Sequence, residues 1–409
     1  AEPRRPPSDL PIGHWAYPFL ERLASRGFIS IDLTTLPLSR HEAAEALRSA
    51  FGPDGTAVPG GLTGREEWSV SLLADELLNG KVDSPALRHA EGGASVGLGL
   101  LLGTELRYTS ARGKPEASMD LNYELWGGIG DDLGFFSDAS VIMEGQEGPR
   151  VERLSSRART WRGVAAQVNR AYVKYRRPHL TLAAGRRDVA WGRSPRGRLT
   201  LSGNAPALDC LDVRFDAGRL RLEAVHAFLE RTDVEAEGAA DTLAFAEGQV
   251  FLAAHRAVVR FGRGSIAVGE AVVYSGDLPD PSYLNPLLPF YLSQHNERAN
   301  DNVLWSLDFL VRPASAFDVW GELVVDDLQY ERDTGAPDKY GLTVGAEHFG
   351  VCPLGDYEVS CEYTNVRKWT YTHFMPGHRF TQDGRALGFE LGPDADRVVS
   401  RAAWHPGPQ

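Results

Sequence analysis

The chain has 409 residues, of which 43 are glycine and 10% are aromatic, and its formal net charge is −12. This acidic balance argues against nucleic acid as a partner, because phosphate binding needs a basic surface. No run of about 18 uncharged apolar residues occurs, so no membrane-spanning helix is predicted, and a transmembrane β-barrel remains open.

The chain begins with the polar, proline-rich stretch AEPRRPP, residues 1–7. Such a stretch is typical of the mature N-terminus that remains after a secretory signal is cleaved. We therefore expect an exported protein.

Up to about residue 80 the sequence has the period of amphipathic helices. In HWAYPFLERLASRGFI, Trp15, Phe19 and Leu23 form one stripe, and Gly27 is placed to cap the helix end. Two further stretches, SRHEAAEALRSAFG and TGREEWSVSLLADELLNG, each open with a capping box. The sequence predicts three short helices.

From about residue 94 the period changes to two, which is typical of strands with one apolar face. The stretch VLWSLDFLVR shows this alternation, with Val303, Trp305, Leu307, Phe309 and Val311 opposite Ser306, Asp308 and Arg312. AYVKYRR behaves in the same way, with Ala171, Val173 and Tyr175 opposite Arg170, Lys174 and Arg176. The strands run roughly 8–12 residues, which is the length that crosses a bilayer when a strand is tilted.

Two architectures fit this pattern, a soluble β-sandwich and a barrel with an apolar outside and a polar lumen. So many consecutive hairpins without helices favour the barrel, because a sheet of that size must close or split to protect its edges. We expect a mainly β protein, a transmembrane antiparallel β-barrel of about 16–18 strands. Residues 1–90 are predicted as a helical periplasmic cap and residues 91–409 as the barrel.

The end of the chain, WHPGPQ, lacks the terminal aromatic residue that closes many bacterial outer-membrane barrels. Two interpretations stay open. Either the sequence stops before the natural C-terminus, or the last strands have been lost.

The three cysteines offer no zinc spacing and no disulfide scaffold. Cys352 and Cys361 flank the turn-like stretch PLGD, and pairing of the flanking strands would put both on one face. A Cys352–Cys361 disulfide and a pair of free thiols are both open, and Cys210 has no partner in either case. We expect no metal and no cofactor, since the histidines show no ligand spacing.

The opening DLPIGHWAYPFLERLASRGFI and the following LPLSRHEAAEALRSAF resemble a single S-layer-homology unit, with its His-Trp-Ala start and its Ser-Arg-x-Glu helix. The resemblance implies that Trp15, Arg40 and Glu42 bind peptidoglycan or another cell-wall polymer. The alternative is that Trp15 is a core residue and Arg40 a charge at a helix end.

A longer part of the chain, roughly residues 160–395, resembles the Wzi family of capsule-assembly outer-membrane proteins. The resemblance depends on four segments in order: GRRDVAWGRSPRGRLTLSGNA, YLNPLLPFY, ANDNVLWSLD and WGELVVDDLQ. Their polar and aromatic residues are the candidate polysaccharide or lumen residues: Arg186, Asp188, Trp191, Arg193, Arg196, Ser202, Asn204, Asn285, Asp301, Asn302, Asp308, Glu322, Asp326 and Asp327. The stretch WGRSPRG departs from the family, which more often has Pro-Gly after the Trp-Gly.

The Wzi resemblance implies a monomeric barrel in the bacterial outer membrane, plugged from the periplasm by its helices, that attaches or organises surface polysaccharide. In that interpretation Trp191 stacks on sugar rings, and the arginines around it bind the carboxylates of an acidic polysaccharide. These arginines are Arg186, Arg187, Arg193, Arg196 and Arg198. The alternative is that they pair with lumen carboxylates, because unpaired buried charge is costly.

Catalysis has little support in the sequence. Asp326 and Asp327 are adjacent, so in a strand they point to opposite faces and cannot act as a paired acid and base. A Gly-x-Ser-x-Gly elbow is absent. We expect a non-enzymatic protein, with two alternatives: a diffusion porin tethered to the cell wall by its N-terminal part, or a structural subunit of an envelope complex.

Overall fold

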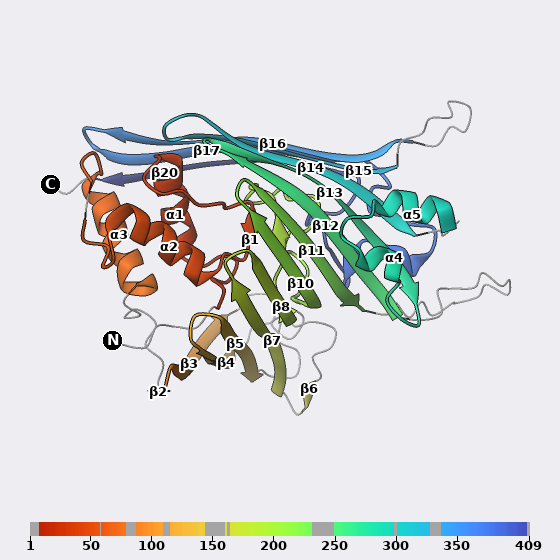
Figure 1. Ribbon diagram of the computed structural model, residues 1–409, viewed down its shortest axis with the longest axis horizontal. Helices are drawn as coiled ribbons and strands as arrows, with labels where there is room; N and C mark the ends of the chain where they lie inside the picture. Colours follow the sequence, from red (N-terminus) through yellow and green to blue (C-terminus); the bar gives the residue numbers. More distant parts are fainter. Residues whose placement is uncertain are drawn as a thin grey trace.

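The computed structural model describes residues 8–57, 59–78, 87–108, 115–143, 160–161, 164–230, 249–297, 301–327 and 337–406. The opening stretch AEPRRPP and the last three residues of WHPGPQ lie outside this range. One large antiparallel sheet follows three N-terminal helices and curves around them (Figure 1). No helix in the described part of the chain is long and apolar enough to span a membrane.

The three predicted helices are present as α1 (Ala16–Ser25), α2 (Arg40–Phe51) and α3 (Gly64–Leu77). Both capping boxes form, because Ser39 and Thr63 each exchange hydrogen bonds with the glutamate three residues later. Gly27 follows α1 with a φ of 84°, a left-handed conformation that glycine adopts without strain. The helices share a core that contains Leu20, Leu23, Leu47, Phe51 and Leu73.

Among the described residues the main sheet has 16 strands, and all but β6 pair one after another in chain order. They are β2 (Leu87–Glu91), β3 (Ala94–Tyr108), β4 (Pro115–Ile129), β5 (Leu133–Met143), β7 (Val164–Arg177), β8 (Leu180–Arg187), β10 (Leu208–Ala217), β11 (Leu220–Leu229), β12 (Gln249–Phe261), β13 (Gly264–Gly276), β14 (Asn302–Ala314), β15 (Phe317–Asp327), β16 (Lys339–Cys352), β17 (Gly355–Val366) and β20 (Ala395–Pro406), with β6 (Thr160–Trp161) paired to β7.

The remaining elements are short. β1 (Thr35–Leu36) pairs with β9 (Ala190–Trp191), and β18 (Thr381–Gln382) pairs with β19 (Arg385–Ala386). Two helices, α4 (Pro281–Leu284) and α5 (Phe290–Glu297), lie between β13 and β14, and a 3-10 turn spans Pro376–His378. The expected boundary between the helical cap and the barrel, after residue 90, falls inside β2, the first strand of the main sheet.

Of the predicted barrel, the described residues show the large antiparallel sheet but not its closure. The sheet path starts at β2 and ends at β20, and these two edge strands are not paired with each other among the described residues. The structure therefore shows a large, curved antiparallel sheet. Strands β3 and β4 have 15 residues each, which is longer than expected.

The predicted alternation of faces is confirmed on β7 and β14. Val173 and Trp305 are exposed on the outward face, and Lys174 and Asp308 are buried on the inward face, which surrounds the helices. The outward face stays apolar and exposed on other strands too, as at Phe228, Val268, Val344 and Val359. An apolar outside and a charged inside are what a membrane-spanning wall requires.

One end of the sheet has only short turns of two or three residues, at 92–93, 130–132, 178–179, 218–219, 262–263, 315–316 and 353–354. The helices lie at this short-turn end (Figure 1). Ala316 in one of these turns donates its N–H to the carbonyl of Ser25, 2.9 Å away, and Arg22 of α1 contacts Asp356 at 2.8 Å.

The expectation of a polar lumen is correct only for the half next to the helices. The other half of the inward face holds an apolar core built by three kinds of segment. They are the strands, the connection after β8 and the connection after β17, with Leu199, Leu201, Val225, Leu252, Val273, Leu304, Tyr371, Phe380 and Phe389 among the members. This end is filled because the two connections turn inward and bury their side chains.

Of the two alternatives for Cys352 and Cys361, the structure shows free thiols and no disulfide, and Cys210 is free as well. In the register of β16 and β17, Cys352 lies opposite Gly355, whereas Cys361 lies opposite Ala346. Six residues of strand thus separate them, about 20 Å at the usual rise. The two residues share a face as expected, but pairing around the turn puts them at different heights.

Candidate functional site

The connection between β8 and β10, residues 188–207, folds into the interior of the sheet. Its β9 pairs with β1 from the N-terminal segment, with Trp191 opposite Thr35. Trp191 is buried, and the guanidinium of Arg256 lies 4.8 Å from the centre of its ring. The indole face that was expected to stack on a sugar is therefore covered by an arginine.

Two arginines of this connection, Arg193 and Arg198, are buried. Arg193 donates to Glu347 at 2.9 Å and lies over the ring of Trp320. Burial lowers the pKa of Arg193, but the nearby carboxylates of Glu21 and Glu347 outweigh it and raise the pKa. Burial dominates at Arg198 and lowers its pKa, and its Nε donates to the carbonyl of Gly192 at 3.0 Å.

Two of the predicted carboxylates lie on strands of the main sheet, here called the wall. Glu322 holds the connection directly, and Asp308 acts through Arg256, which covers Trp191. Glu322 accepts the N–H of Leu199 at 2.9 Å, and Asp308 pairs with Arg256 at 3.2 Å. Gly192 has a φ of 97°, and a Cβ there would overlap the Oε1 of Glu322. A side chain at position 192 would have to displace this carboxylate.

The remaining predicted residues of the connection, together with Arg186 at the end of β8, are paired inside the protein or exposed. Arg186 pairs with Asp209 at 2.7 Å, Asp188 lies 3.6 Å from Arg170, and Arg196 is exposed. Burial raises the pKa of Asp188. Ser202 and Asn204 donate to carbonyl groups of the connection after β17, at 3.0 and 3.1 Å. The structure thus gives most of this set the internal pairing that was the alternative interpretation.

Ionic contacts fix the N-terminal segment to the inward face. Asp9 contacts Lys174 and Arg187, and Glu42 contacts Arg214 and Arg221 at 3.2 Å each. Burial would raise the pKa of Glu42, but the two arginines outweigh it and lower the pKa to about 2. Lys174 and Arg187 lower the pKa of Asp9 against the effect of burial in the same way.

The proposed cell-wall residues are engaged inside the protein. Arg40 is buried and paired with Glu76 between α2 and α3. Glu42 also accepts the N–H of Ser39 as part of the capping box. Trp15 is half-buried and packs edge-on against Phe19.

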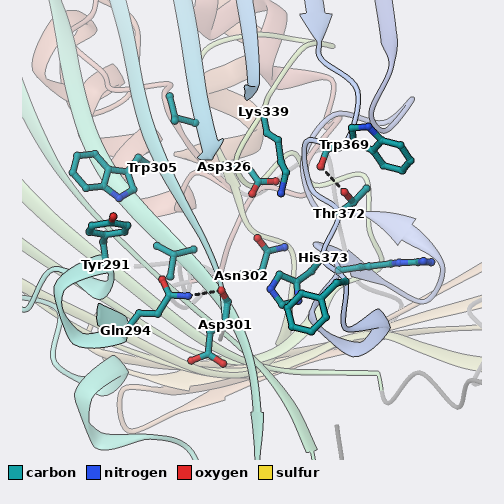
Figure 2. Close-up of a pocket in the computed structure, with 14 residues that line it drawn as sticks. Tyr291, Gln294, Asp301, Asn302, Trp305, Asp326, Lys339, Trp369, Thr372 and His373 are labelled. Carbon is teal, nitrogen blue, oxygen red and sulfur yellow. Dashed lines mark hydrogen bonds between the residues drawn. The ribbon is translucent and has the colours of Figure 1, made fainter. Parts of the chain in front are cut away.

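A cavity of about 840 Å³ opens at the end of the sheet opposite the helices. It lies over the ends of β14 and β15, between α5 and the segment 369–379 (Figure 2). Four aromatic side chains line it and are about half exposed or more, namely Tyr291, Trp305, Trp369 and Phe374. The rings of Tyr291 and Trp305 meet edge to face at 5.8 Å.

Polar groups surround these rings. Asp301, Asn302 and Asp326, all predicted from the sequence, line the cavity, together with Lys339 and Arg379. Gln294 donates to the carbonyl of Asp301 at 2.6 Å, and Lys339 reaches toward Asp326 (Figure 2). Exposed rings beside carboxylate, amide and cationic groups form a surface that can bind a polar ligand with flat apolar faces.

Neighbouring contacts hold these polar groups in place. Asp301 accepts the hydroxyl of Tyr283 at 2.7 Å, and Asn302 donates to the carbonyl of His378 at 2.8 Å. Asp326 accepts the N–H of Tyr371 at 2.6 Å. Burial raises the pKa of Asp301, whereas burial and then His378 lower the pKa of His373 to about 4.

Two predicted residues lie elsewhere. Asn285 is exposed after α4, and its Oδ1 accepts the N–H of Leu287 at 3.0 Å. Asp327 is the last residue of β15, with its backbone opposite Lys339. The sequence interpretation missed Tyr291, Lys339, Trp369, Phe374 and Arg379, although the aromatic stretch KWTYTHF was a usable signal for Trp369 and Phe374.

Across the described part of the chain, no three or more His, Cys, Asp or Glu side chains are arranged to hold a metal ion. The cavity is lined by aromatic and hydrogen-bonding groups.

The family model described as capsule assembly protein Wzi matches residues 114–405. Among solved structures, the fold matches Wzi of Escherichia coli, an outer-membrane protein involved in group 1 capsule assembly and described as a carbohydrate-binding β-barrel. The TM-score is 0.63 at 16% identity, over 95% of this chain and 79% of that one. No curated protein sequence matches the chain.

Two outer-membrane proteins show much weaker likeness. OmpF of Salmonella typhi, solved with daunomycin, matches at a TM-score of 0.36 and 11% identity, over 69% of this chain and 81% of that one. OmpT of Vibrio cholerae matches at 0.33 and 13% identity, over 77% and 98%. These scores are too low to support an argument.

Proposed function

The chain belongs to the Wzi family of capsule assembly proteins, and from this premise we propose that it is a monomeric outer-membrane β-barrel that binds an acidic surface polysaccharide. Its role is in capsule assembly and is not enzymatic. The Escherichia coli relative is described as a carbohydrate-binding barrel of group 1 capsule assembly, and the proposal extends carbohydrate binding to this chain.

The proposal assigns an orientation in the membrane. Bacterial outer-membrane barrels have short periplasmic turns and longer extracellular loops. The short-turn end, where the helices lie, is thus assigned to the periplasm, with residues 1–90 as the cap and 91–409 as the barrel. The cavity over β14 and β15 then faces the cell exterior, where the polysaccharide is.

The cavity is the observation that carries the proposal. Trp369 and Phe374 present exposed rings on which the apolar face of a sugar ring can stack, and Asp326 and Asn302 supply groups that bond hydroxyls. Lys339 and Arg379 add cations that attract carboxylates of a uronate-containing polymer. The connection 188–207 has a supporting role, since its arginines and carboxylates are paired with the wall.

Binding of an isolated anionic polysaccharide to the purified protein tests this function. Trp369→Ala should weaken binding about 2- to 12-fold, because it removes a stacking surface worth ~0.5–1.5 kcal/mol. Trp404→Ala is the matched control, since Trp404 is similarly exposed but lies on β20 outside the cavity. Equal binding by both variants and the wild type would exclude the cavity as the binding site.

The diffusion porin predicted as an alternative is disfavoured by the filling of the lumen. Helices with ionic ties occupy one half, and an apolar core occupies the other. Single-channel recording of the reconstituted protein distinguishes the two functions. We expect a blocked barrel, and a large, steady conductance would favour the porin.

A second binding function, for a cell-wall polymer, is proposed for the helices. Trp68 is exposed on α3 and packs edge-on against Phe19, which in turn contacts Trp15. This aromatic row sits on the periplasmic side in the proposed orientation. Co-sedimentation with purified peptidoglycan tests it, and retention that is unchanged by Trp68→Ala would contradict it.

A further inference from the structure

The segment 281–297, formed by α4, α5 and the turn between them, packs against the outward face of the sheet (Figure 1). The segment contributes two buried side chains to this contact, Tyr283 and Phe290. On the strand side they meet a cluster on β12, β13 and β14, made of Phe251, Ala253, Val272, Tyr274 and Val303. The segment thus covers part of the same wall that is bare and apolar elsewhere.

Beneath α5 lies a polar pair on this outward face. Glu270 is buried, His255 lies opposite it in the register of β12 and β13, and the two side chains are 3.5 Å apart. Glu270 shares its face with Ile266 and Val268, which are exposed. A bare carboxylate among such residues would be costly in lipid.

The segment removes this cost in two ways. The N–H of Phe290, the first residue of α5, donates to the carboxylate of Glu270, which places a negative charge at a helix N-terminus. The ring of Phe290 lies 4.1 Å from that of His255 and covers it. Glu270 therefore both anchors the segment and is hidden by it.

The other side of the segment is apolar and exposed. Leu284, Leu287, Leu288 and Leu292 are all exposed, Leu287 most of all at 74%. These leucines continue the bare apolar surface formed by Ile266 and Val268 on β13.

The backbone of the turn is arranged as lipid requires. Pro286 and Pro289 have no N–H, Leu287 donates to Asn285 Oδ1 at 3.0 Å, and Leu288 donates to the Asn285 carbonyl at 3.2 Å. Phe290 donates to Glu270, so every N–H from 286 to 290 is absent or bonded. Within this turn no N–H is left free, so the turn avoids the cost that a free group would have in hydrocarbon.

We propose that segment 281–297 is a membrane strap, anchored by Glu270, whose leucines are immersed in the acyl chains of the outer leaflet. The proposal rests on the sheet crossing the outer membrane, as proposed above. Its partner is lipid, because the exposed leucines of the strap continue the lipid-facing wall.

Spin labels on single cysteines test the strap in vesicles of phosphatidylcholine and phosphatidylglycerol. The label goes on Leu287→Cys in a Cys352→Ala, Cys361→Ala background, where the remaining Cys210 is buried. Native Cys361, exposed on the bare outward wall, is the lipid control in Cys352→Ala. Gly262→Cys in the double-alanine background is the water control, since a Cβ there meets nothing within 4 Å.

We expect oxygen to reach the labels at 287 and 361 better than a polar nickel chelate does, with the reverse at 262. A label at 287 that behaves like 262 while 361 reports lipid would overturn the strap and leave the membrane-spanning sheet intact. If 361 also reports water, the placement of the sheet itself fails. Spin–spin broadening at 287 that disappears on dilution would instead show a second copy covering the leucines, which also overturns the proposal.

The role of Glu270 as the anchor is tested by the mobility of the label at position 287. Glu270→Ala should increase the mobility of the label at 287, whereas Glu270→Gln, which can still accept the N–H of Phe290, should preserve most of the immobilisation. Identical spectra for Glu270→Ala and the unsubstituted protein would refute the role of Glu270.

Discussion

The guanidinium of Arg256 lies over the ring of Trp191 at 4.8 Å and donates to the carbonyl of Thr34 at 2.9 Å. One wall residue thus contacts both the connection 188–207 and the N-terminal segment. Glu223, at 2.6 Å, and Asp308, at 3.2 Å, neutralise its charge. The filling of the lumen therefore depends on a few buried cations of the wall.

Arg256→Ala should destabilise the protein by ~3–5 kcal/mol, because it leaves Glu223 and Asp308 buried with less compensation. The midpoint of urea unfolding, followed by tryptophan fluorescence in detergent, measures this. Arg263→Ala is the matched control, since Arg263 is exposed in the turn after β12, and its effect should stay within ~0.5 kcal/mol. Similar midpoints for the two variants would show that Arg256 has no special role.

Acid should loosen the N-terminal segment. Glu42 has a pKa of about 2 when it is docked, below its ordinary value of 4.5, so its stabilising effect is complete above pH 4.5 and is lost as the pH falls toward 2. Asp9 and Asp32 also have lowered pKa values, because nearby cations outweigh burial, so they act in the same direction. Tryptophan fluorescence in detergent should therefore change as the pH falls through this range, because Trp191 pairs with Thr35 of the N-terminal segment.

Glu42→Gln is the control for the acid effect. It should weaken docking at neutral pH and reduce the change between pH 4.5 and 2, because one titrating carboxylate is gone. An unaltered pH profile in this variant would mean that Glu42 does not hold the segment.

Gly192→Ala should destabilise the protein by ~1–3 kcal/mol. The backbone there has a φ of 97°, and the new methyl group would collide with Glu322. Gly218→Ala is the matched control, because its φ is also positive at 63° but a Cβ there meets nothing within 4 Å. Comparison of the two urea midpoints separates the collision from backbone strain, and equal losses would argue that the contact with Glu322 is unimportant.

Arg379→Gln should weaken binding of an anionic polysaccharide by up to about 5-fold and make binding less sensitive to salt, because an exposed cation at the cavity is removed. Arg219→Gln, in a turn at the opposite end, should leave both properties unchanged. Isothermal titration at two ionic strengths gives both readouts. A salt dependence that is the same in all three proteins would contradict a role for Arg379.

The wall could be predicted from the sequence because its two faces differ in polarity. Val173 and Lys174 alternate as expected, and the capping boxes at Ser39 and Thr63 marked the helix starts. The apolar half of the lumen could not be predicted in this way. Along β12, Phe251 and Ala253 face outward while Leu252 and Ala254 face inward, and all four are buried, so the period of two disappears.

The candidate site was predictable only in its strand residues. Asp301, Asn302 and Asp326 lie at strand ends, where a family motif marked them. Trp369 and Phe374 belong to an irregular connection, and no local pattern indicates that it meets α5 across the cavity. The internal partners of Arg193 and Glu322 likewise come from distant parts of the chain and are set by the tertiary fold.

The ionic ties of the helices have a consequence for the order of assembly. Arg22 binds a carboxylate 334 positions further along the chain, and Glu42 binds an arginine 172 positions further. The part of the chain that is synthesised first can therefore dock only after the wall that receives it has formed, since contacts so distant in sequence are slow to close. The helices have a core and capping boxes of their own, so their folding does not have to wait for the wall.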